Sequence, residues 1–333
     1  MGFFSPEAQA IFLYGGVSHM GIVYTIKGPV DSSDLGPILP HEHLPMHYHG
    51  QEDDEFEKGS KYIVRDWYSR ILDDLLKTPF RTMVDCTMIG HGRDINFRRE
   101  LIGERPIHVV MATGFYIDSN QPEWAKEKSS EECAELMINE LEEGIGETGV
   151  RAGIIKLAPV ASSGQSRKLC RAGAAASLKT DARITTHSCS RNRETFDLLT
   201  GYGVAPENIY VGHADFADSL ENKYICKNGG NLIFTVWDID YMIPDKLMYK
   251  RFAELIRAGF AEQVLMSVDF AIMVHNGKAP TFLSWTLYGV ERRTHDYLHN
   301  VVIPKLKNEY GVSDDEIGTI TEENPRRMLD FRS

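Results

Sequence analysis

The sequence predicts an α/β fold in which eight parallel strands close into a single barrel and a helix follows each strand. Three observations support this prediction. Short apolar segments recur from about residue 38 onward, amphipathic segments separate them, and several of the apolar segments end at an ionisable residue. Short segments rich in apolar and β-branched residues are typical of parallel strands that are buried on both faces. Strands that alternate with helices along one chain favour a parallel α/β architecture.

The predicted strands are eight segments, each five or six residues long. They are Ile38–His43, Thr82–Thr87, His108–Thr113, Gly153–Leu157, Arg183–His187, Ile209–His213, Leu232–Val236 and Val264–Asp269.

The segments between these strands have the pattern of amphipathic helices. Glu131 to Gly144 carries apolar residues among acidic ones. Arg191 to Gly203 follows Ser190, a suitable N-cap, and ends at glycine, and Lys246 to Gly259 repeats this design. The acidic segment from Gln51 to Lys58 is predicted to be a solvated loop.

A doubly wound open sheet is the alternative architecture. It usually carries a glycine-rich turn after its first strand. Here the first strand ends in His41-Glu42-His43 and no such turn follows, so the closed barrel is favoured. No linker divides residues 21–333, and we expect one domain there. Residues 1–20, with Gly15-Gly16-Val17-Ser18-His19-Met20, are interpreted as an N-terminal extension left by cloning or by an upstream start.

Composition narrows the functional classes. The chain has 333 residues and a net charge of −12, which argues against a nucleic-acid surface because phosphate binding requires basic patches. Five cysteines without a CxxC pair indicate a reducing compartment, and we expect a cytoplasmic protein. No apolar run is long enough for a membrane span, and no basic residue precedes the apolar stretch near the N-terminus, so neither a membrane association nor a signal peptide is expected.

Histidines and an aspartate end several of the predicted strands. His41 and His43 are two residues apart, so both side chains point to the same face of their strand. His187, His213 and Asp269 end three further strands, and strand ends meet at one mouth of a barrel. Each residue alone is more often structural, as a hydrogen-bonded histidine or a helix cap. Together they form the donor set that zinc or manganese prefers.

Two further features near these positions need interpretation. His47-Tyr48-His49 repeats the same spacing and is predicted to lie in a surface loop. Lys156 lies in an otherwise apolar strand, where a buried ammonium costs several kcal/mol unless it is paired or neutralised. Burial favours the neutral, nucleophilic amine, which can add carbon dioxide and become a carbamate that bridges two cations. The alternative is a lysine whose ammonium extends into solvent.

These residues and their flanking segments resemble the phosphotriesterase-like group of the amidohydrolase superfamily. The match is spread from Ile22 to Phe331, and its order and spacing are specific to the family but not to one substrate. The matching segments are Gly36–Leu44 (GPILPHEHL), Gly92–Ile95 (GRDI), Ala112–Asp118 (ATGFYID), Gly153–Ala158 (GIIKLA), Thr186-His187, Val211–Asp215 (VGHAD), Ser267–Asp269 and Glu323–Arg327 (ENPRR).

The resemblance implies a (β/α)₈ TIM-barrel hydrolase with a binuclear metal centre, in which a metal-bridging hydroxide attacks the substrate. The metals would be zinc, with manganese, cobalt or iron as alternatives. The implied ligands are His41, His43 and Asp269 for the more buried ion, His187 and His213 for the more exposed ion, and carboxylated Lys156 between the two. Asp269 would also be catalytic, taking the proton of the attacking hydroxide.

The resemblance also bears on the substrate. Tyr116 resembles the tyrosine that lactonase relatives place beside the hydroxide; the alternative is a residue that packs the barrel rim. Arg251 and Lys278 are the candidates for binding a substrate phosphate, and no arginine cluster follows Asp269. The residues expected to line an apolar mouth are Phe115, Trp237, Phe270, Ile272 and Met273, with Lys278 as a further substrate contact.

We therefore expect hydrolysis of an uncharged lactone or carboxylic ester, with phosphotriester hydrolysis as a secondary activity. Phosphorylated sugar lactones and N-acyl amides are alternative substrates of the same site. A non-catalytic small-molecule-binding protein and a metal-dependent nuclease are alternatives of other classes. Relatives are often dimers, and the outer helices of the barrel would support a homodimer; the sequence leaves the oligomeric state open.

One departure from the family pattern concerns the proton route. Members that hydrolyse organophosphates commonly have a second aspartate soon after the sixth-strand histidine and a histidine at the seventh strand. Here Asp215 and Asp218 flank Phe216, and the seventh strand ends in Val236-Trp237-Asp238. The route of the proton beyond Asp269 stays open.

Overall fold

The computed structural model describes residues 21–56, 58–159, 163–188, 191–239, 242–274, 281–282 and 293–330. The N-terminal extension, Ser190 and Lys278 lie outside these ranges.

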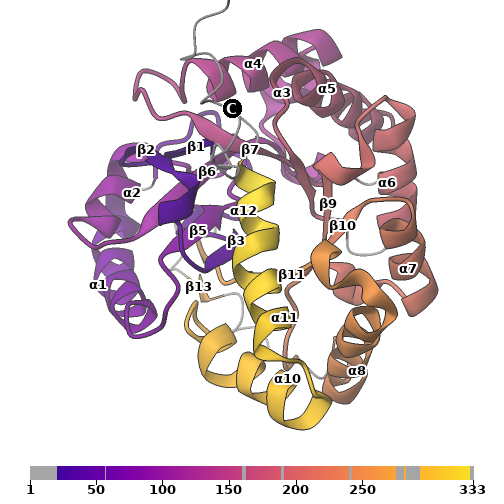
Figure 1. Ribbon diagram of the computed structural model, residues 1–333. Coiled ribbons are helices and arrows are strands. Elements are labelled where there is room, and N and C mark those ends of the chain that lie inside the picture. Colours follow the sequence, from indigo (N-terminus) through magenta and orange to yellow (C-terminus); the bar gives the residue numbers. More distant parts are fainter. Residues whose placement is uncertain are drawn as a thin grey trace, which may run out of the picture.

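An eight-stranded parallel sheet forms the centre of the fold, as predicted (Figure 1). Each strand pairs with the next in chain order, which is the arrangement of a (β/α)₈ barrel. The strands are β3 (Ile38–Glu42), β5 (Thr82–Asp85), β6 (His108–Phe115), β7 (Ala152–Leu157), β8 (Ile184–Thr186), β9 (Ile209–Gly212), β10 (Asn231–Phe234) and β11 (Val264–Met266).

Backbone hydrogen bonds join the first and last strands and close the barrel. The amide of Asp269 donates to the carbonyl of His41 over 3.2 Å, and the amide of His43 donates to the carbonyl of Phe270 over 3.1 Å. The residues after β11 therefore lie beside the histidines of β3, although more than 200 residues separate them along the chain.

Six of the eight strands end one to three residues before their predicted carboxyl ends, whereas β7 ends at Leu157 as predicted and β6 continues to Phe115. His43, His187 and His213 each follow a strand by one residue, and Asp269 follows β11 by three. The chain leaves the sheet there because His213 and Asp269 adopt a left-handed backbone conformation, which a continuous strand does not contain.

Helices surround the barrel (Figure 1). They are α1 (Lys58–Leu75), α2 (Ile95–Ile102), α3 (Glu123–Glu127), α4 (Ser130–Glu142), α5 (Gly164–Thr180), α6 (Asn192–Gly201), α7 (Ser219–Lys227), α8 (Asp245–Leu255), α10 (Ile303–Tyr310), α11 (Asp314–Gly318) and α12 (Asn324–Leu329). The main apolar core fills the space between these helices and the outer face of the barrel. No helix in the described ranges is both long and apolar enough to cross a membrane.

Two of the predicted helices begin or end differently from expectation. Arg191, and not Ser190, is the N-cap of α6, and it makes no side-chain capping bond. The helix predicted to end at Gly259 has regular α-geometry only to Leu255 and continues as a π-helical turn, Ile256–Phe260, which contains the left-handed Gly259. In contrast, α4 begins with a complete capping box formed by Ser129 and Glu132.

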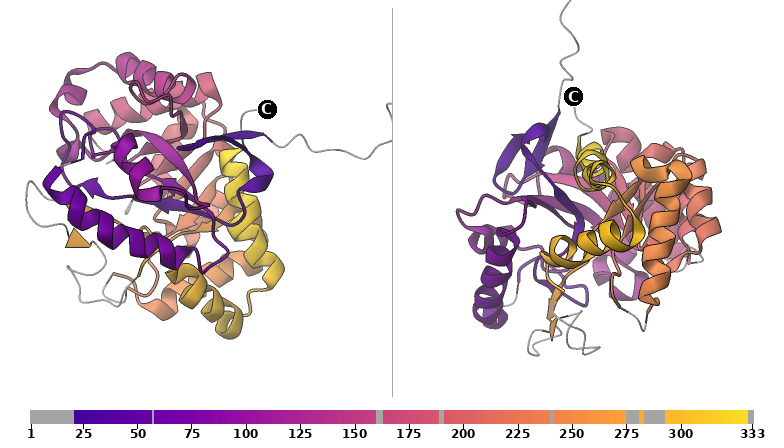
Figure 2. Two further views of the ribbon diagram at one scale, coloured as in Figure 1. Left: turned by 90° about the vertical axis from the view of Figure 1, so that its left-hand side faces the viewer. Right: turned by 60° about the horizontal axis from the view of Figure 1, so that its bottom comes forward.

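The two ends of the barrel are closed by different elements. At one end lie α12 and the hairpin of β1 (Ile22–Thr25) and β2 (Gly28–Asp31); at the other lies a small sheet of β4 (Met46–His47), β12 (Ile272–Val274) and β13 (Thr281–Phe282) (Figure 2). Met328 and Leu329 of α12 pack with the apolar residues that fill the barrel interior. Only the end opposite α12 is therefore free to hold polar side chains.

One loop prediction was wrong for His47, and another was incomplete. His47 is buried in β4 and does not lie in a surface loop. The acidic segment is anchored and not simply solvated, because Asp54 forms an ion pair with the buried Arg93 at 2.8 Å. Arg93 also pairs with Glu140 of α4, so the segment is tied to the helical layer.

Candidate metal centre

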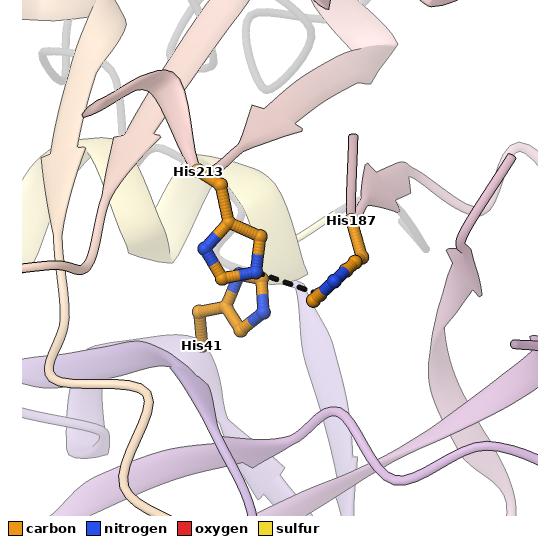
Figure 3. A group of neighbouring side chains, drawn as sticks. All are labelled: His41, His187 and His213. Atoms are coloured by element: carbon orange, nitrogen blue, oxygen red, sulfur yellow. Dashed lines mark hydrogen bonds between the residues drawn. The ribbon is translucent and has the colours of Figure 1, made fainter. Parts of the chain in front are cut away.

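Six polar side chains converge at the carboxyl ends of the barrel strands. Figure 3 shows His41, His187 and His213 pointing toward one another from three different strands. The full set is His41 in β3, His43 directly after it, Lys156 in β7, His187 after β8, His213 after β9 and Asp269 after β11.

An irregularity in β3 places both histidines of the first strand at this site. Leu39 pairs with Met83, whereas Glu42 pairs with Asp85, so β3 contains one extra residue between these positions. Ile38 faces the barrel interior and Leu39 the outer core. Simple alternation would therefore turn His41 outward. The extra residue reverses the alternation and directs His41 and His43 inward.

The ligand atoms form two groups that share His41. The first contains His41, His187 and His213, and the second contains His41, His43 and Asp269; within each group the ligand atoms lie within 4.8 Å of one another. Nε2 of His43 is 3.4 Å from Oδ1 of Asp269. Ligand atoms around a tetrahedral zinc ion are about 3.3 Å apart, so this group matches a metal site with little change.

The second pair of histidines is closer together. Nε2 of His213 and Nδ1 of His187 are 2.7 Å apart, and Nε2 of His213 is 3.7 Å from Oδ2 of Asp269. A metal ion between the two rings would require them to separate slightly. The arrangement brings all five predicted histidine and aspartate ligands into one cluster that could hold metal.

Lys156 is fully buried beside this cluster. Its Nζ lies 2.6 Å from Nε2 of His41 and 3.3 Å from the carbonyl oxygen of Thr186. The alternative in which the ammonium extends into solvent is therefore wrong.

Burial sets the protonation of the histidines. It lowers the pKa of His41 well below 6.5, with a further contribution from the charge of Lys156, and it lowers the pKa of His213 to about 4. Burial also lowers the pKa of His187 well below 6.5, helped by His213 and Lys156. At neutral pH these imidazoles are uncharged, which is the form that binds metal.

The pKa of Asp269 is also lowered, but for a carboxyl group this favours the charged form. Burial raises its pKa, but the contact with His43 and the neighbouring His213 and His41 outweigh burial, so its pKa falls well below 3.8. Neutral imidazoles with one carboxylate are a donor set for zinc and similar ions. Nε2 of His41 faces this donor set, 3.8 Å from Oδ1 of Asp269 and 2.6 Å from Nζ of Lys156. The residues fit a metal centre.

The backbone of two candidate ligands is strained. His213 and Asp269 have φ values of 57° and 53°, which cost about 1–3 kcal/mol each in non-glycine residues. Glu42 stabilises the second of these conformations, because its carboxylate accepts hydrogen bonds from the amides of Val268 and Phe270 on both sides of Asp269. Strain at two ligand positions is typical of a functional site.

Gly212 leaves the space that His41 needs, and its replacement gives a first testable prediction. A Cβ at Gly212 would lie 2.1 Å from the carbonyl oxygen of Thr186 and 2.8 Å from Cε1 of His41. We expect Gly212→Ala to destabilise the protein by about 1–3 kcal/mol and to weaken metal binding, because β8 or His41 must move. Chemical unfolding and metal titration measure both effects.

Gly201→Ala is the matched control, since nothing lies within 4 Å of a Cβ at that helical position. It should leave both properties near their wild-type values. Wild-type stability and metal affinity in Gly212→Ala would show that the contact with His41 does not matter.

Most of the predicted substrate contacts are buried in apolar clusters. Phe115, Trp237 and Phe270 are at most 1 % exposed and pack in the core, with the indole of Trp237 donating to the carbonyl of Ser267 over 3.0 Å. Ile272 is buried in β12, and Met273, 8 % exposed, packs in a small cluster with Met46 and Ala271. The structure thus does not support an apolar mouth formed by these side chains.

Tyr116 does lie at the cluster. Its hydroxyl is 3.4 Å from Nε2 of His187, and the two rings meet edge to face with centroids 5.2 Å apart. His91, which the sequence analysis did not single out, packs against Tyr116 with a centroid distance of 5.4 Å, and burial lowers its pKa to about 4. The feature of the sequence that could have identified His91 is its position in the loop after the second predicted strand.

The sequence analysis also missed polar residues that contact the candidate ligands from behind. Thr87 and Thr235 contact Nδ1 of His43 and of His213, respectively. Both threonines could have been found in the sequence as polar residues within predicted apolar strands, which is the feature that identified Lys156.

Asp238, at the end of the seventh strand, does not join the site. Its carboxylate accepts hydrogen bonds from Tyr249, Tyr297 and Lys305, which hold it toward α8 and α10. Arg251 donates to the carbonyl of Ala217 over 3.3 Å.

Comparison with known proteins identifies the family. Residues 21–329 match the sequence model of the Phosphotriesterase family. The chain belongs to the phosphotriesterase family. The family match, together with the aryldialkylphosphatase and lactonase relatives, identifies the chain as a hydrolase that acts on ester bonds.

Individual relatives carry different activities in their names. An aryldialkylphosphatase of Saccharolobus solfataricus is 28 % identical over 91 % of this chain and 98 % of its own length. An N-acetyltaurine hydrolase of Tetraodon nigroviridis is 25 % identical over 94 % of this chain and 99 % of its own. A variant of a PTE-like lactonase of Deinococcus radiodurans has a TM-score of 0.81 and 26 % identity, covering 92 % of this chain and 99 % of that one. The family is shared, while the substrates differ.

Proposed function

We propose that this phosphotriesterase-family protein is a binuclear metal-dependent hydrolase of a lactone or carboxylic ester, with phosphotriester hydrolysis as a secondary activity. The observation that carries the proposal is the convergence of four histidines and Asp269 around the buried Lys156. The proposed metals are zinc ions, with manganese, cobalt or iron as alternatives, because nitrogen and carboxylate donors suit them.

The proposed ligands follow the two groups in the structure. His41, His43 and Asp269 would hold the more buried ion, and His187 and His213 the more exposed one. Lys156 would be carboxylated and would bridge the two. Two divalent cations supply four positive charges, of which carbamate, Asp269 and hydroxide neutralise three, so the site remains slightly cationic.

Two divalent ions, when bound, supply a hydroxide nucleophile at neutral pH and polarise the substrate oxygen. The chain supplies the remaining chemistry. Asp269, ionised at neutral pH, accepts the proton that the nucleophile releases. Tyr116 is placed beside His187 to orient the ester or lactone through its hydroxyl.

Three observations support an uncharged lactone or ester. The hydroxyl of Tyr116 lies 3.4 Å from Nε2 of His187 at the cluster, and a solved PTE-like lactonase variant has the same fold. Arg251, a candidate for binding a substrate phosphate, is engaged with a backbone carbonyl. Phosphorylated sugar lactones and N-acyl amides are the alternatives for the same site, and the N-acetyltaurine hydrolases among the relatives give the amide alternative its support.

The test begins with metal content. Protein purified without a chelator is expected to contain about two equivalents of zinc or a similar ion per polypeptide. Anomalous scattering should place the ions about 4 Å apart. Lactones of increasing acyl length, an aryl acetate, a dialkyl aryl phosphate, a phosphorylated lactone and an N-acyl amide are then compared by kcat/KM. We expect the uncharged lactones to react fastest, and chelation followed by metal addition to abolish and restore the activity.

The other outcomes decide between the alternatives. Faster hydrolysis of the phosphorylated lactone or of the amide would replace the substrate assignment while leaving the metal chemistry in place. Tight binding of these compounds without turnover, at full metal content, would make the protein a small-molecule binder. Absence of metal in protein purified without chelator would count against the binuclear centre itself.

A further inference from the structure

Two buried hydrogen-bond chains stand directly behind the candidate metal centre, and each ends on a different histidine. In the first, Nδ1 of His43 lies 3.1 Å from the hydroxyl of Thr87, and that hydroxyl donates to Oδ1 of Asp85 over 2.6 Å. The three side chains are at most 7 % exposed, so water does not compete for these bonds.

The second chain repeats this arrangement on the other side of the site. Nδ1 of His213 lies 2.8 Å from the hydroxyl of Thr235, which donates to Oδ2 of Asp215 over 3.2 Å. These three side chains are also buried. The two chains come from different strands and share no residue.

The direction of both chains is fixed by their carboxylates. Oδ1 of Asp85 accepts from the amides of Leu44 and Thr87 as well as from the Thr87 hydroxyl, and Oδ2 accepts from Arg98 over 2.6 Å. Asp85 is therefore an acceptor only, and the single hydroxyl proton of Thr87 must point toward it. What remains for His43 is a lone pair of the hydroxyl, which accepts a hydrogen bond from Nδ1–H.

The same reasoning applies to the second chain. Oδ1 and Oδ2 of Asp215 accept from the amide of Thr235, and Oδ1 also accepts from the amide of Val236. The hydroxyl proton of Thr235 then points to Asp215, and the hydroxyl accepts from Nδ1 of His213.

When Nδ1 of a neutral imidazole carries the proton, Nε2 has the free lone pair. For His43 this lone pair faces Oδ1 of Asp269 at 3.4 Å, and for His213 it faces Nδ1 of His187 and Oδ2 of Asp269. Each lone pair is therefore available to a metal ion, and at His43 it faces a carboxylate oxygen that cannot donate to it. The two rings belong to different ligand groups, so each group has one ring that is oriented in this way.

We propose that Thr87 with Asp85 and Thr235 with Asp215 are positioning residues, which fix His43 and His213 as Nδ1–H tautomers and present one Nε2 lone pair to each of two metal ions. This inference rests on the proposed function for the metals, but the tautomers are a property of the metal-free protein. Hydrogen-bond partners of metal-binding histidines typically change metal affinity about 10–100-fold.

Thr87→Val and Thr235→Val test the proposal, because valine keeps the shape and removes the hydroxyl. The metal-free proteins are titrated with zinc against a chromophoric chelator, and with cobalt(II) followed by its visible absorption. Thr87→Val is expected to weaken one of the two bound equivalents about 10–100-fold, and Thr235→Val the other, while the second equivalent in each variant stays near the wild-type affinity. Thr87→Ser and Thr235→Ser should restore the wild-type values.

Thr185→Val is the matched control. Thr185 is a buried barrel threonine whose hydroxyl has no hydrogen-bond partner within the described residues. The same substitution there removes no hydrogen bond to a histidine. It should leave both metal affinities unchanged. Equal weakening by all three valine variants, or failure of both serine variants to restore binding, would overturn the proposal and indicate a general packing effect.

Nitrogen-15 NMR of the histidine rings gives a readout that does not depend on metal. Wild-type metal-free protein is expected to show Nδ1–H tautomers for His43 and His213, and each valine variant should lose that preference at its own ring. Nε2–H tautomers in the wild type would overturn the inference. A wild-type protein with the expected tautomers but without metal affinity would instead refute the proposed function.

Discussion

Lys156→Ala is expected to lose both metal ions and to lower kcat/KM about 10³-fold or more, since the metals supply several kcal/mol of transition-state stabilisation. Nζ of Lys156 lies fully buried, 2.6 Å from a candidate ligand. An ammonium there would repel two divalent cations by several kcal/mol, even at an effective dielectric constant of about 20. Addition of carbon dioxide to the neutral amine forms a carbamate and releases a proton, which turns the repulsion into coordination. Metal and carbon dioxide should therefore bind cooperatively.

Elemental analysis of Lys156→Ala gives the metal content, and a short carboxylic acid in the buffer should restore part of both metal and activity. Lys156→Met is the companion variant, because it keeps most of the side-chain volume and should fail in the same way. The decisive observation is electron density at Lys156 in metal-loaded crystals grown with bicarbonate. An unmodified ammonium that points away from two bound ions would refute the carbamate.

Asp269→Asn is expected to lower kcat about 10³-fold while the fold survives, because general-base catalysis typically contributes about 10²–10⁴-fold. The pKa of Asp269 lies well below 3.8, so its carboxylate is ionised at neutral pH and can accept a proton. Asparagine has nearly the same shape but cannot accept that proton, and it also removes one negative charge from the centre. Steady-state kinetics on a verified lactone, at saturating metal, measure the effect.

Asp238→Asn is the matched control for this variant. Asp238 also follows a barrel strand and also has a positive φ of 52°, but it bonds to tyrosines and a lysine away from the cluster. It should change stability more than metal content or kcat. Activity of Asp269→Asn within a few-fold of the wild type would remove Asp269 from the proton transfer.

The sequence alone determined the architecture and the identity of the candidate ligands. The alternation of short apolar segments with amphipathic ones predicted the parallel barrel, and that barrel is observed. His41, His43, His187, His213 and Asp269 were recognisable because the carboxyl ends of parallel strands must meet at one mouth. Both inferences use information that is local in the chain, namely side-chain period and the residue that follows each strand.

Only the tertiary structure decided which side chains face the site. The extra residue in β3 reverses its alternation and turns His41 inward, and no local pattern marks that irregularity. Phe115 and Trp237 were predicted at the mouth of the barrel. They pack in the core instead, because helices cover the outer face of the barrel and contact the aromatic side chains there.

The bonds that hold β3 against the end of β11 were likewise not predictable from the sequence. The bond from the amide of His41 to the hydroxyl of Ser267 joins residues 226 positions apart. The bond from the amide of Val268 to the carboxylate of Glu42 joins residues equally far apart. Such pairs exist only once the barrel has closed. The sequence by itself determined which chemistry the chain carries, and closure of the barrel decided how each ligand is held, because orientation depends on contacts between strands that are remote along the chain.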